Sequence, residues 1–313
     1  MNKRVYGIIG IRAKHANWNA DFSGFPKSTG DGDFFGSDKA LKYPMKKMWE
    51  NNGEKVLYTK SMILAGEDYR PRTLKERYEQ IHETELKQKK GKDAGTPKKE
   101  VLKNLFNSVD VKQFGATFAE EGNNFGITGA VQISQGFNKY ENMSVEEQHI
   151  LSPFGRVKDD KNTDQSSLGT KITANEAHYF YHFVVNPRTY KDYADMGVTE
   201  GYTEADYNRF KEASLISATA FNTNSKIGCD NEFTLFVEVE AGVYLPDLTS
   251  FVSVDELEGD KREISLNLEL LEKIESKVKS IEIYYNDALL DIKGNIPKGV
   301  KYFNIFTKER IGE

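Results

Sequence analysis

Four lysines cluster on a segment that is predicted to be helical. Within residues 38–52, Lys39, Lys42 and Lys46 recur at i, i+3 and i+7, and Lys47 lies beside them. A helix would bring their ammonium groups to one face. Cations in such a row can neutralise successive phosphates of a nucleic-acid strand. A solvated helix face is the alternative, and it is the more common use of such a pattern.

The loop before this helix adds groups that could contact a nucleic acid or a metal. Trp18 offers a ring for base stacking, and Asn17 and Asn19 offer amide donors for a phosphate backbone. Trp18 is equally suited to pack beneath the loop. The carboxylates of this loop could hold a divalent cation, or they could simply form turns; they are Asp21, Asp31 and Asp33.

Other chemistry has weaker support. The stretch Gly30–Gly36 is rich in glycine, but its spacing does not fit a dinucleotide fingerprint or a P-loop, so we interpret it as a surface loop. His178 and His182 share one face of a predicted strand about 13 Å apart, too far for joint zinc ligation from that strand. Cys229 is a lone cysteine and is interpreted as a buried, inert thiol. We therefore assign no catalytic residue, no metal and no cofactor.

The elements that would position these residues follow from local patterns. Strands are expected at 4–12, 55–64, 125–135, 177–186, 233–240 and 280–285, and helices at 38–52, 73–90, 98–107, 204–221 and 267–278. Ser37 and Thr73 are candidate N-caps, and Thr203 with Asp206 fits a capping box. Pro44 lies inside the first helix, where it favours a kink. When two polar insertions are left out, the order is strand, helix, strand, strand, helix, strand. This order is typical of an α+β, ferredoxin-like or RRM-like core.

Two insertions interrupt this core. We assign the core to 1–64, 126–135 and 177–313, and the insertions to 65–125 and 136–176. The first insertion contains the most basic stretch of the chain, with 8 basic and 3 acidic residues over 87–112. The second is polar and shows no clear core-forming period. Both are expected to project from the core.

Composition excludes several classes of protein. The 313 residues are 38% hydrophobic, enough to bury a core, so wholesale disorder is excluded. The net charge of −5 is concentrated in 232–291, with 15 acidic and 5 basic residues, and the chain lacks the basic pI of a free-standing nucleic-acid binder. No apolar run approaches the roughly 18 residues of a membrane span, and no signal peptide is recognisable. We expect a cytoplasmic protein without a membrane partner.

Several motifs, taken together, resemble one family. They are HANWNADFSGFPK, GDFFGSDKALKYPMKKMWENNGEKVLY, DVKQFGATFA and FGITGAVQISQG. In order and spacing they look like the CRISPR-associated backbone protein of Cascade complexes, a member of the RAMP superfamily. The Csh branch of type I-B systems is the most similar group. The resemblance covers roughly residues 1–240.

This resemblance implies a fold and an assembly. The core would be an RRM-like palm, 65–125 the fingers and 136–176 the thumb. Copies of the chain would polymerise along one CRISPR RNA, with each thumb crossing the guide, and the guide would pair with target DNA. Further partners would be the 5′-handle-binding and large subunits. An acidic face could contact a neighbouring subunit.

The resemblance also implies which residues bind RNA. The loop after the first strand and the following helix would line the guide channel, through Arg12, Asn17, Asn19, Lys27, Lys39, Lys42, Lys46 and Lys47. Additional candidates are Lys112, Gln113 and Phe114, and in the thumb Phe154, Arg156 and Lys158.

Two alternatives remain at this point. Backbone subunits of the related type III complexes cleave RNA with an aspartate in the loop after the first strand, where this chain has Asp21, Asp31 and Asp33. The type I-B group does not cleave, so we expect a protein that is not an enzyme. The other alternative is a ferredoxin-like scaffold that binds no RNA.

Overall fold

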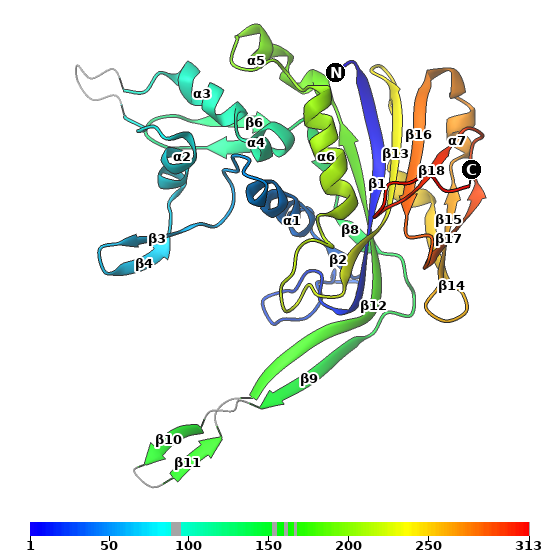
Figure 1. Ribbon diagram of the computed structural model, residues 1–313, viewed down its shortest axis with the longest axis horizontal. Coiled ribbons are helices and arrows are strands. Elements are labelled where there is room, and N and C mark those ends of the chain that lie inside the picture. Colours follow the sequence, from blue (N-terminus) through cyan, green and yellow to red (C-terminus); the bar gives the residue numbers. More distant parts are fainter. Residues whose placement is uncertain (89–94, 152–154, 160–161, 166–167, 313) are drawn as a thin grey trace.

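One large sheet forms the centre of the molecule (Figure 1). The computed structural model describes residues 1–88, 95–151, 155–159, 162–165 and 168–312. Within this part of the chain the sheet has the order β18-β16-β13-β1-β12-β8-β2, and β7 and β9 also pair with β12. The bounds are β1 (Lys3–Ala16), β2 (Phe35–Gly36), β7 (Val131–Ile133), β8 (Gly136–Asn138), β9 (Val145–Leu151), β12 (Leu168–Val185), β13 (Cys229–Glu240), β16 (Val278–Tyr285) and β18 (Lys301–Asn304).

Two capped helices connect the central strands. Along the chain, β1, α1 (Asp38–Asn51), β7, β12, α6 (Glu204–Ile216) and β13 have the order strand, helix, strand, strand, helix, strand. The prediction placed the second strand of this order at 55–64, whereas β7 takes that place in the structure. The pairs β13–β1, β1–β12 and β12–β7 are all antiparallel. The predicted caps are confirmed, because Ser37 accepts the N–H of Ala40 and Thr203 forms a capping box with Asp206. The prediction of a mixed α and β fold is also confirmed.

The predicted strand at 55–64 is wrong. Leu57 and Tyr58 donate their backbone N–H groups to the buried carboxylate of Asp110, at 2.9 and 2.8 Å. A side chain therefore supplies the acceptors that a neighbouring strand would have supplied. Only the end of this segment is extended, and it pairs as β3 (Met62–Ala65) with β4 (Asp68–Pro71) away from the main sheet.

The first insertion carries helices and two hairpins, at the left of Figure 1. After β3 and β4 come α2 (Leu74–His82), α3 (Lys98–Phe106), α4 (Val109–Phe114), β5 (Gly115–Phe118) and β6 (Phe125–Thr128). The capping box of Thr73 is present, but α2 ends well before residue 90 because Glu83 takes a left-handed conformation. The predicted strand 125–135 is divided between β6 and β7. At the break, a Cβ on Gly129 would lie 2.2 Å from the Phe114 backbone, so the two chain segments approach closely there.

The second insertion contains strands that the sequence did not predict. β12 is 18 residues long and continues beyond the main sheet, where its residues Leu168–Ala174 pair with β9 (Figure 1). We call this pair of strands the ribbon. Two further strands, β10 (Gly155–Asp159) and β11 (Asn162–Gln165), pair with each other. At the other end of β12, a 3-10 helix (Pro187–Tyr190) and α5 (Lys191–Asp195) lead to α6.

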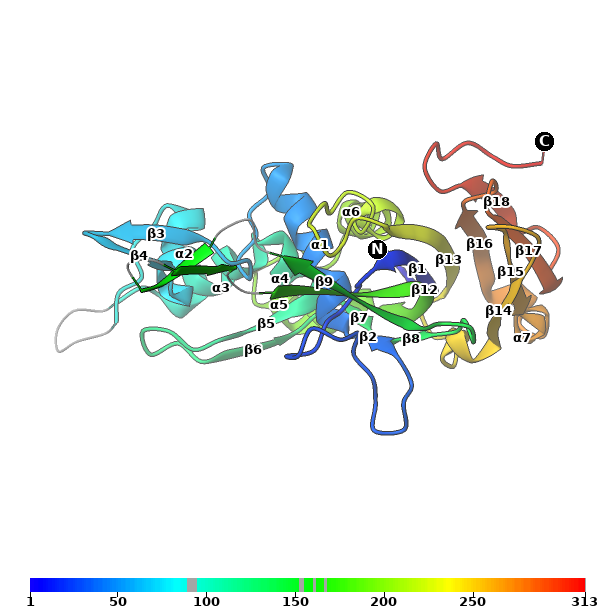
Figure 2. The same cartoon turned by 90° about the horizontal axis from the view of Figure 1, so that it is seen from below.

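The C-terminal region forms a second sheet that covers the main one. Its strands β14 (Val252–Glu256), β15 (Arg262–Asn267) and β17 (Leu290–Asn295) are accompanied by α7 (Glu269–Glu272) and two 3-10 helices, Leu248–Phe251 and Glu275–Lys277. The predicted helix at 267–278 is thus mostly absent, whereas the predicted strand at 280–285 is part of β16. Figure 2 shows α1 and α6 on one side of the main sheet and this C-terminal sheet on the other.

Both faces of the main sheet are therefore buried. Leu41, Met45 and Phe210 of the helices pack in one apolar cluster with β1 and β12. Val254 and Ile264 of the C-terminal sheet pack in a second cluster with other residues of the main sheet. No helix in the described part of the chain is long and apolar enough to cross a membrane.

Trp18 anchors the start of α1 to the main sheet. Its side chain is fully buried, and its Nε1–H donates to the hydroxyl of Tyr181 in β12 at 2.5 Å. Gly36 directly precedes the cap of α1 and lies against both rings. A Cβ there would be 1.9 Å from the Tyr181 oxygen and 2.6 Å from the Trp18 ring.

We predict that Gly36→Ala destabilises the protein by about 1–3 kcal/mol, because the added methyl group overpacks this contact. Gly30→Ala is the matched control: a Cβ at Gly30 meets no atom within 4 Å, so its effect should stay within about 0.5 kcal/mol. Urea unfolding followed by circular dichroism measures both. Equal stability of the two variants would contradict the proposed anchor.

Candidate nucleic-acid interface

The lysines of α1 divide into two groups. Lys42 is 2.8 Å from Asp38, and its ammonium lies 5.2 Å from the centre of the Phe114 ring. Lys46 lies 3.8 Å from Asp110 and 5.5 Å from the centre of the Tyr58 ring. Burial lowers the pKa of Lys46, although the nearby Asp110 carboxylate opposes this effect. These two lysines therefore face the first insertion and stabilise its contact with α1.

Lys39 and Lys47 are more available. Lys39 is exposed and forms no ion pair with any residue that the structure describes. Lys47 is half-buried and pairs with Glu50 of the same helix. Pro44 is accommodated inside α1, which continues to Asn51. The four lysines therefore do not form a single row. Lys39 and Lys47 lie along the exposed edge of α1.

The loop before α1 joins the helix to the ribbon. Asn19 accepts the backbone N–H of Ser37 at 2.9 Å, and the backbone N–H of Lys27 donates to the carbonyl of Asn19 at 2.9 Å. Asn17 donates to the carbonyl of Ile172 in β12 at 3.2 Å. The two asparagines therefore order the loop, which also carries the half-buried Lys27.

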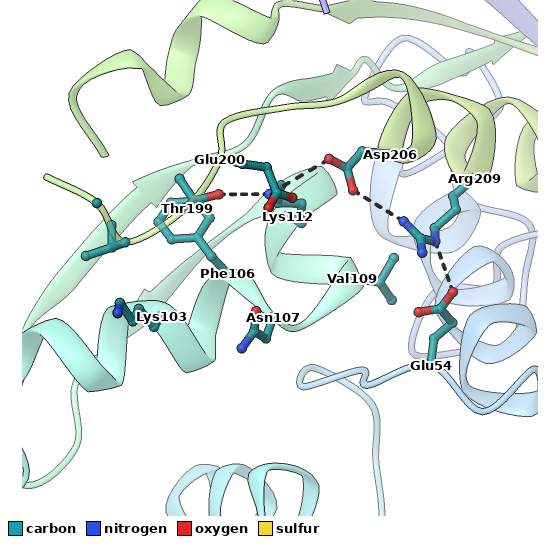
Figure 3. Close-up of a pocket in the computed structure, with 12 residues that line it drawn as sticks. Glu54, Lys103, Phe106, Asn107, Val109, Lys112, Thr199, Glu200, Asp206 and Arg209 are labelled. Carbon is teal, nitrogen blue, oxygen red and sulfur yellow. Dashed lines mark hydrogen bonds and ion pairs between the residues drawn. The ribbon is translucent and has the colours of Figure 1, made fainter. Parts of the chain in front are cut away.

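Lys112 and Gln113 are engaged inside the protein. Both are buried in α4 and form contacts within the chain. The Lys112 ammonium donates to Thr199 at 2.8 Å and lies 3.3 Å from Glu200 and 3.8 Å from Asp206 (Figure 3). Gln113 donates to the Asp206 carbonyl at 2.8 Å. These side chains thus tie α4 to the start of α6.

A cleft of about 570 Å³ opens beside Lys112, lined also by Lys103 and Arg209 and by acidic side chains (Figure 3). Phe114 is half-buried and stacks obliquely on Trp49, with ring centres 5.7 Å apart. It therefore packs at the contact between α1 and the first insertion.

The predicted residues of the second insertion are described only in part. Phe154 lies outside the described residues. The backbone of Arg156 and Lys158 belongs to β10.

The loop aspartates and Cys229 show no arrangement for catalysis. The carboxylate of Asp21 accepts the backbone N–H groups of Ser23 and Phe25, at 2.8 and 3.0 Å, as in a turn. Asp31 and Asp33 are exposed. Among the described residues there is no group of three acidic, histidine or cysteine side chains that could hold a metal. Burial raises the pKa of Cys229 to about 12, so its thiol stays protonated.

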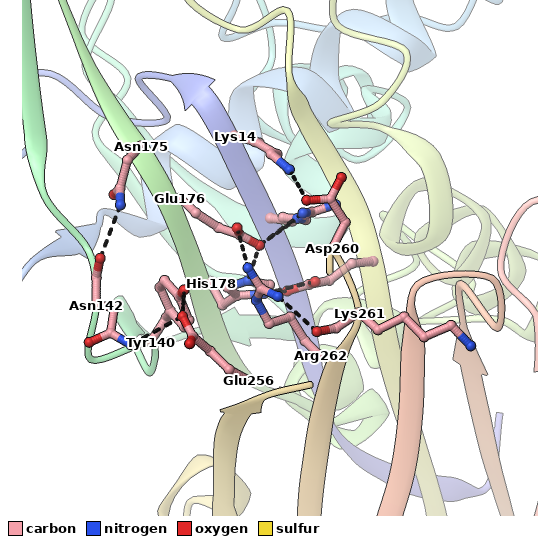
Figure 4. Close-up of polar contacts among 12 residues, drawn as sticks. Lys14, Tyr140, Asn142, Asn175, Glu176, His178, Glu256, Asp260, Lys261 and Arg262 are labelled. Carbon is pink, nitrogen blue, oxygen red and sulfur yellow. Dashed lines mark hydrogen bonds and ion pairs between the residues drawn. The ribbon is translucent and has the colours of Figure 1, made fainter. Parts of the chain in front are cut away.

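Arg12 lies on the opposite face of the main sheet from α1, and the structure does not bring it together with the lysines. Its guanidinium donates to Glu176 of β12 at 3.0 Å. Arg262 of the C-terminal sheet donates to the other oxygen of Glu176 at 2.7 Å (Figure 4). Arg12 is therefore part of a buried charged cluster between the two sheets.

His178 completes this cluster. Its Nδ1 lies 2.8 Å from a carboxylate oxygen of Glu232, and its Nε2 lies 3.0 Å from Glu176. Because both ring nitrogens face carboxylates, both must carry protons, and the ring is an imidazolium. Burial opposes this charge, but the two carboxylates outweigh it and raise the pKa of His178. A β-bulge in β13 aims Glu232 at the ring, since Gly10 pairs with Phe233 but Ile11 pairs with Asn231.

Sequence reasoning missed this cluster. The available signal was a pair of charged residues, Glu176 and His178, at alternate positions of a strongly apolar strand. On a buried strand such residues need buried partners. The partners, Glu232 and Arg262, are far apart in sequence and could not be identified by spacing.

The cluster predicts a pH dependence of stability. The pKa of His178 is raised above 6.5 in the folded state, so its contribution is full below about pH 6.5 and is lost as pH rises through the folded value. The pKa of Glu176 is lowered to about 2, despite its burial, by His178 and the two arginines. Its contribution is therefore present above about pH 4.5 and is lost as pH falls towards 2.

Urea unfolding between pH 6 and pH 9 tests this prediction. Stability should fall by up to about 1.4 kcal/mol per pH unit. The variant His178→Gln should lose this slope, and His149→Gln, which replaces an exposed histidine, should keep it. A His178→Gln variant with the wild-type slope would show that another group titrates.

Comparisons with known proteins identify the family. The profile of CRISPR-associated protein Cas7 matches residues 3–272. A chain of a "CRISPR RNA-guided surveillance complex, pre-nicking" aligns with a TM-score of 0.54 at 14% identity, over 94% of this chain and 97% of that chain. A chain of another "CRISPR RNA-guided surveillance complex" aligns with a TM-score of 0.47 at 14% identity, over 91% and 94%. No curated protein sequence matches. On the extent of the profile match, the chain belongs to the Cas7 family of CRISPR-associated proteins.

Proposed function

We propose that this protein is a CRISPR RNA-binding backbone subunit of a surveillance complex. We call the exposed edge of α1, the loop before it and the base of the ribbon the proposed RNA surface. The observation that carries the proposal is that hydrogen bonds join this loop to Ile172 of the ribbon, through Asn17, and to Ser37 at the start of α1, through Asn19. Lys39 and Lys27 supply cations on this surface, and Asn17 and Asn19 order it. Membership in the Cas7 family and the likeness in fold to a surveillance-complex chain support it.

The buried faces of the main sheet limit where RNA can bind. RRM domains stack bases on aromatic side chains of an open sheet face. Here the aromatic residues that the central strands β1, β12 and β13 place on the corresponding face are Tyr6, Phe180 and Phe233, and all three are buried beneath the C-terminal sheet. Tyr285 and Tyr302 of the outer strands β16 and β18 are half-buried against the same apolar cluster. RNA would therefore bind on the side of α1 and the loop, through phosphates and without a sheet platform.

The finer features of the proposal come from the motifs of the chain. We propose a type I-B complex in which copies of the subunit polymerise along the guide, with the palm, fingers and thumb assigned as in the sequence analysis. The guide would pair with target DNA, and the 5′-handle-binding and large subunits would complete a cytoplasmic complex. Phe154, Arg156 and Lys158 stay candidates for the thumb's contact with RNA. The proposed channel omits the candidates whose side chains contact other parts of the protein, which are Arg12, Lys42, Lys46, Lys112, Gln113 and Phe114.

We predict that the protein binds single-stranded RNA with weak sequence preference and steep salt dependence. Each phosphate contact releases about 0.7 counterion from a single strand. Replacing Lys27 and Lys39 by alanine should reduce the slope of log affinity against log salt by about 1.4. Fluorescence anisotropy between 50 and 300 mM salt, roughly, measures it.

A double variant of Lys191 and Lys273, which are exposed and outside the proposed surface, is the control and should retain the wild-type slope. Wild-type binding by the Lys27 and Lys39 variant would contradict the proposed surface. Lys46→Ala is unsuitable for this test, because it would leave the buried Asp110 without its nearest cation. If purified complexes contain no RNA of uniform length, the scaffold alternative is favoured instead.

We also predict that the subunit does not cleave RNA. Asp21 is engaged by backbone N–H groups within its own turn. Asp31 and Asp33 are exposed, and neither belongs to a group of three acidic, histidine or cysteine side chains that could hold a metal within the part of the chain that the structure describes. Incubation of the guide complex with complementary RNA and Mg²⁺ should leave the RNA intact on a denaturing gel. Cleavage at regular intervals that disappears in Asp21→Ala or Asp33→Ala would instead establish the ribonuclease alternative.

A further inference from the structure

The ribbon projects from the main sheet as two strands that, beyond Ala174, pair only with each other in the described part of the chain. Their pairing alone does not fix the angle between the ribbon and the sheet. Beyond Ala174, β12 no longer pairs with β1, and within the described residues its only partner there is β9. An isolated pair of strands is marginally stable in water. Contacts at the base of the ribbon must therefore set the angle at which it projects.

The turn between β14 and β15 makes such contacts to one strand of the base. Glu256 accepts a hydrogen bond from the hydroxyl of Tyr140 and another, at 3.1 Å, from the amide of Asn142. Tyr140 and Asn142 lie between β8 and β9, where the chain enters the ribbon. Asn175 of β12 donates to the carbonyl of Asn142 at 3.0 Å, so this contact extends across both strands (Figure 4).

The same turn reaches the other strand and β1. Arg262 donates to Glu176 of β12 at 2.7 Å, and its guanidinium lies 5.3 Å from the centre of the Tyr140 ring. Asp260 forms an ion pair with Lys14, near the end of β1. Three neighbouring parts of the chain are thus held by residues 256–262, which we call the clamp turn (Figure 4).

We propose that the clamp turn is a positioning device that fixes the direction of the ribbon for guide binding, with Glu256, Asp260 and Arg262 as its positioning residues. The proposal rests on the proposed function, because it assigns the ribbon a contact with RNA. It gives the acidic C-terminal block a role: its carboxylates hold the base of the ribbon instead of contacting the guide. A ribbon held in one direction loses less conformational entropy when it closes on RNA.

The test uses two double variants of the full-length protein with the same change in charge. Glu256→Ala with Asp260→Ala removes the hydrogen bonds to Tyr140 and Asn142 and the ion pair with Lys14, and it leaves the contacts of Arg262 in place. Asp255→Ala with Glu258→Ala removes two exposed carboxylates of the same hairpin, for which the structure shows no contact to the ribbon. Glu256→Gln keeps an oxygen that can accept from Tyr140 and Asn142, and serves as the conservative variant.

Distances between two spin labels report the direction of the ribbon without RNA. The labels are placed at His149→Cys in the ribbon and Lys191→Cys near α6, both exposed positions, and the buried, protonated thiol of Cys229 should stay unlabelled. We expect one narrow distance distribution in the parent protein, the Asp255/Glu258 variant and Glu256→Gln. The Glu256/Asp260 variant should show a distribution about twofold broader, and about three- to tenfold weaker binding of a guide RNA.

The possible results distinguish the clamp turn, its role in guide binding and the proposed function. A distribution that stays narrow in the Glu256/Asp260 variant would overturn the clamp, whatever its RNA affinity. Equal broadening in the Asp255/Glu258 variant would overturn it too, because the effect would then be one of charge alone. Broadening with unchanged RNA affinity would overturn the role in guide binding. Failure of the parent protein to bind RNA would overturn the proposed function, while the label distances would still test the clamp.

Discussion

Burial of both faces of the main sheet is the constraint on which the rest of the structure depends. The helices cover one face and the C-terminal sheet covers the other, so the sheet contributes apolar burial and no open binding platform. The RNA contacts that we propose therefore involve parts that leave the sheet: the loop after β1, the edge of α1 and the ribbon that extends β12. These three are joined by hydrogen bonds, from Asn17 to Ile172 and from Ser37 to Asn19.

The face of the main sheet beneath the C-terminal sheet contains a cluster of buried charges. Opposite charges in this cluster face one another, which allows them to be buried. The Glu176 carboxylate accepts hydrogen bonds from Arg12, Arg262 and His178. His178 also lies within hydrogen-bonding distance of Glu232. Taking such charges out of water costs several kcal/mol per ion, so a buried cluster contributes little net stability. Removing one member would cost about 3–5 kcal/mol, because the others would be left unpaired. The cluster therefore specifies how the C-terminal sheet sits on β12, next to the base of the ribbon.

Local patterns predicted the fold where the determinants were local. The caps of α1 and α6 were recognised because Ser37 and Thr203 lie within a few residues of the groups they bind. The strand at 55–64 failed because its hydrogen-bond acceptor, Asp110, is about fifty residues away. β14 and β15 were missed because their alternating apolar residues, such as Val252 and Val254, are embedded in a strongly acidic segment.

The same distinction applies to the candidate site. Lysine spacing predicted one row of four cations on α1, but it could not show that Lys46 pairs with Asp110 of another helix or that Lys42 lies against Phe114. Arg12 is the last residue of the predicted strand 4–12, and the structure places it within β1. The pairing of β1 with β12 and β13 decides which side of the sheet the Arg12 side chain lies on, and Arg262 of the C-terminal sheet contacts the same carboxylate there. The residue pattern of a single strand contains neither piece of information.

The geometry also resolves an apparent conflict between an acidic chain and an RNA-binding role. Much of the acidic block, including Asp255, Glu256 and Asp260, lies in the hairpin of the C-terminal sheet, which covers the opposite side of the main sheet from α1 (Figure 2). Glu238 and Glu282 of the same block lie in the main sheet, where they pair with Lys3 and Lys211. Stacked sheets are about 10 Å apart, and α1 lies one layer further, whereas the Debye length is about 8 Å at physiological salt. Repulsion between the acidic block and a guide on α1 is therefore largely screened. What matters for binding is the local charge near Lys27 and Lys39, and a net charge of −5 does not argue against it.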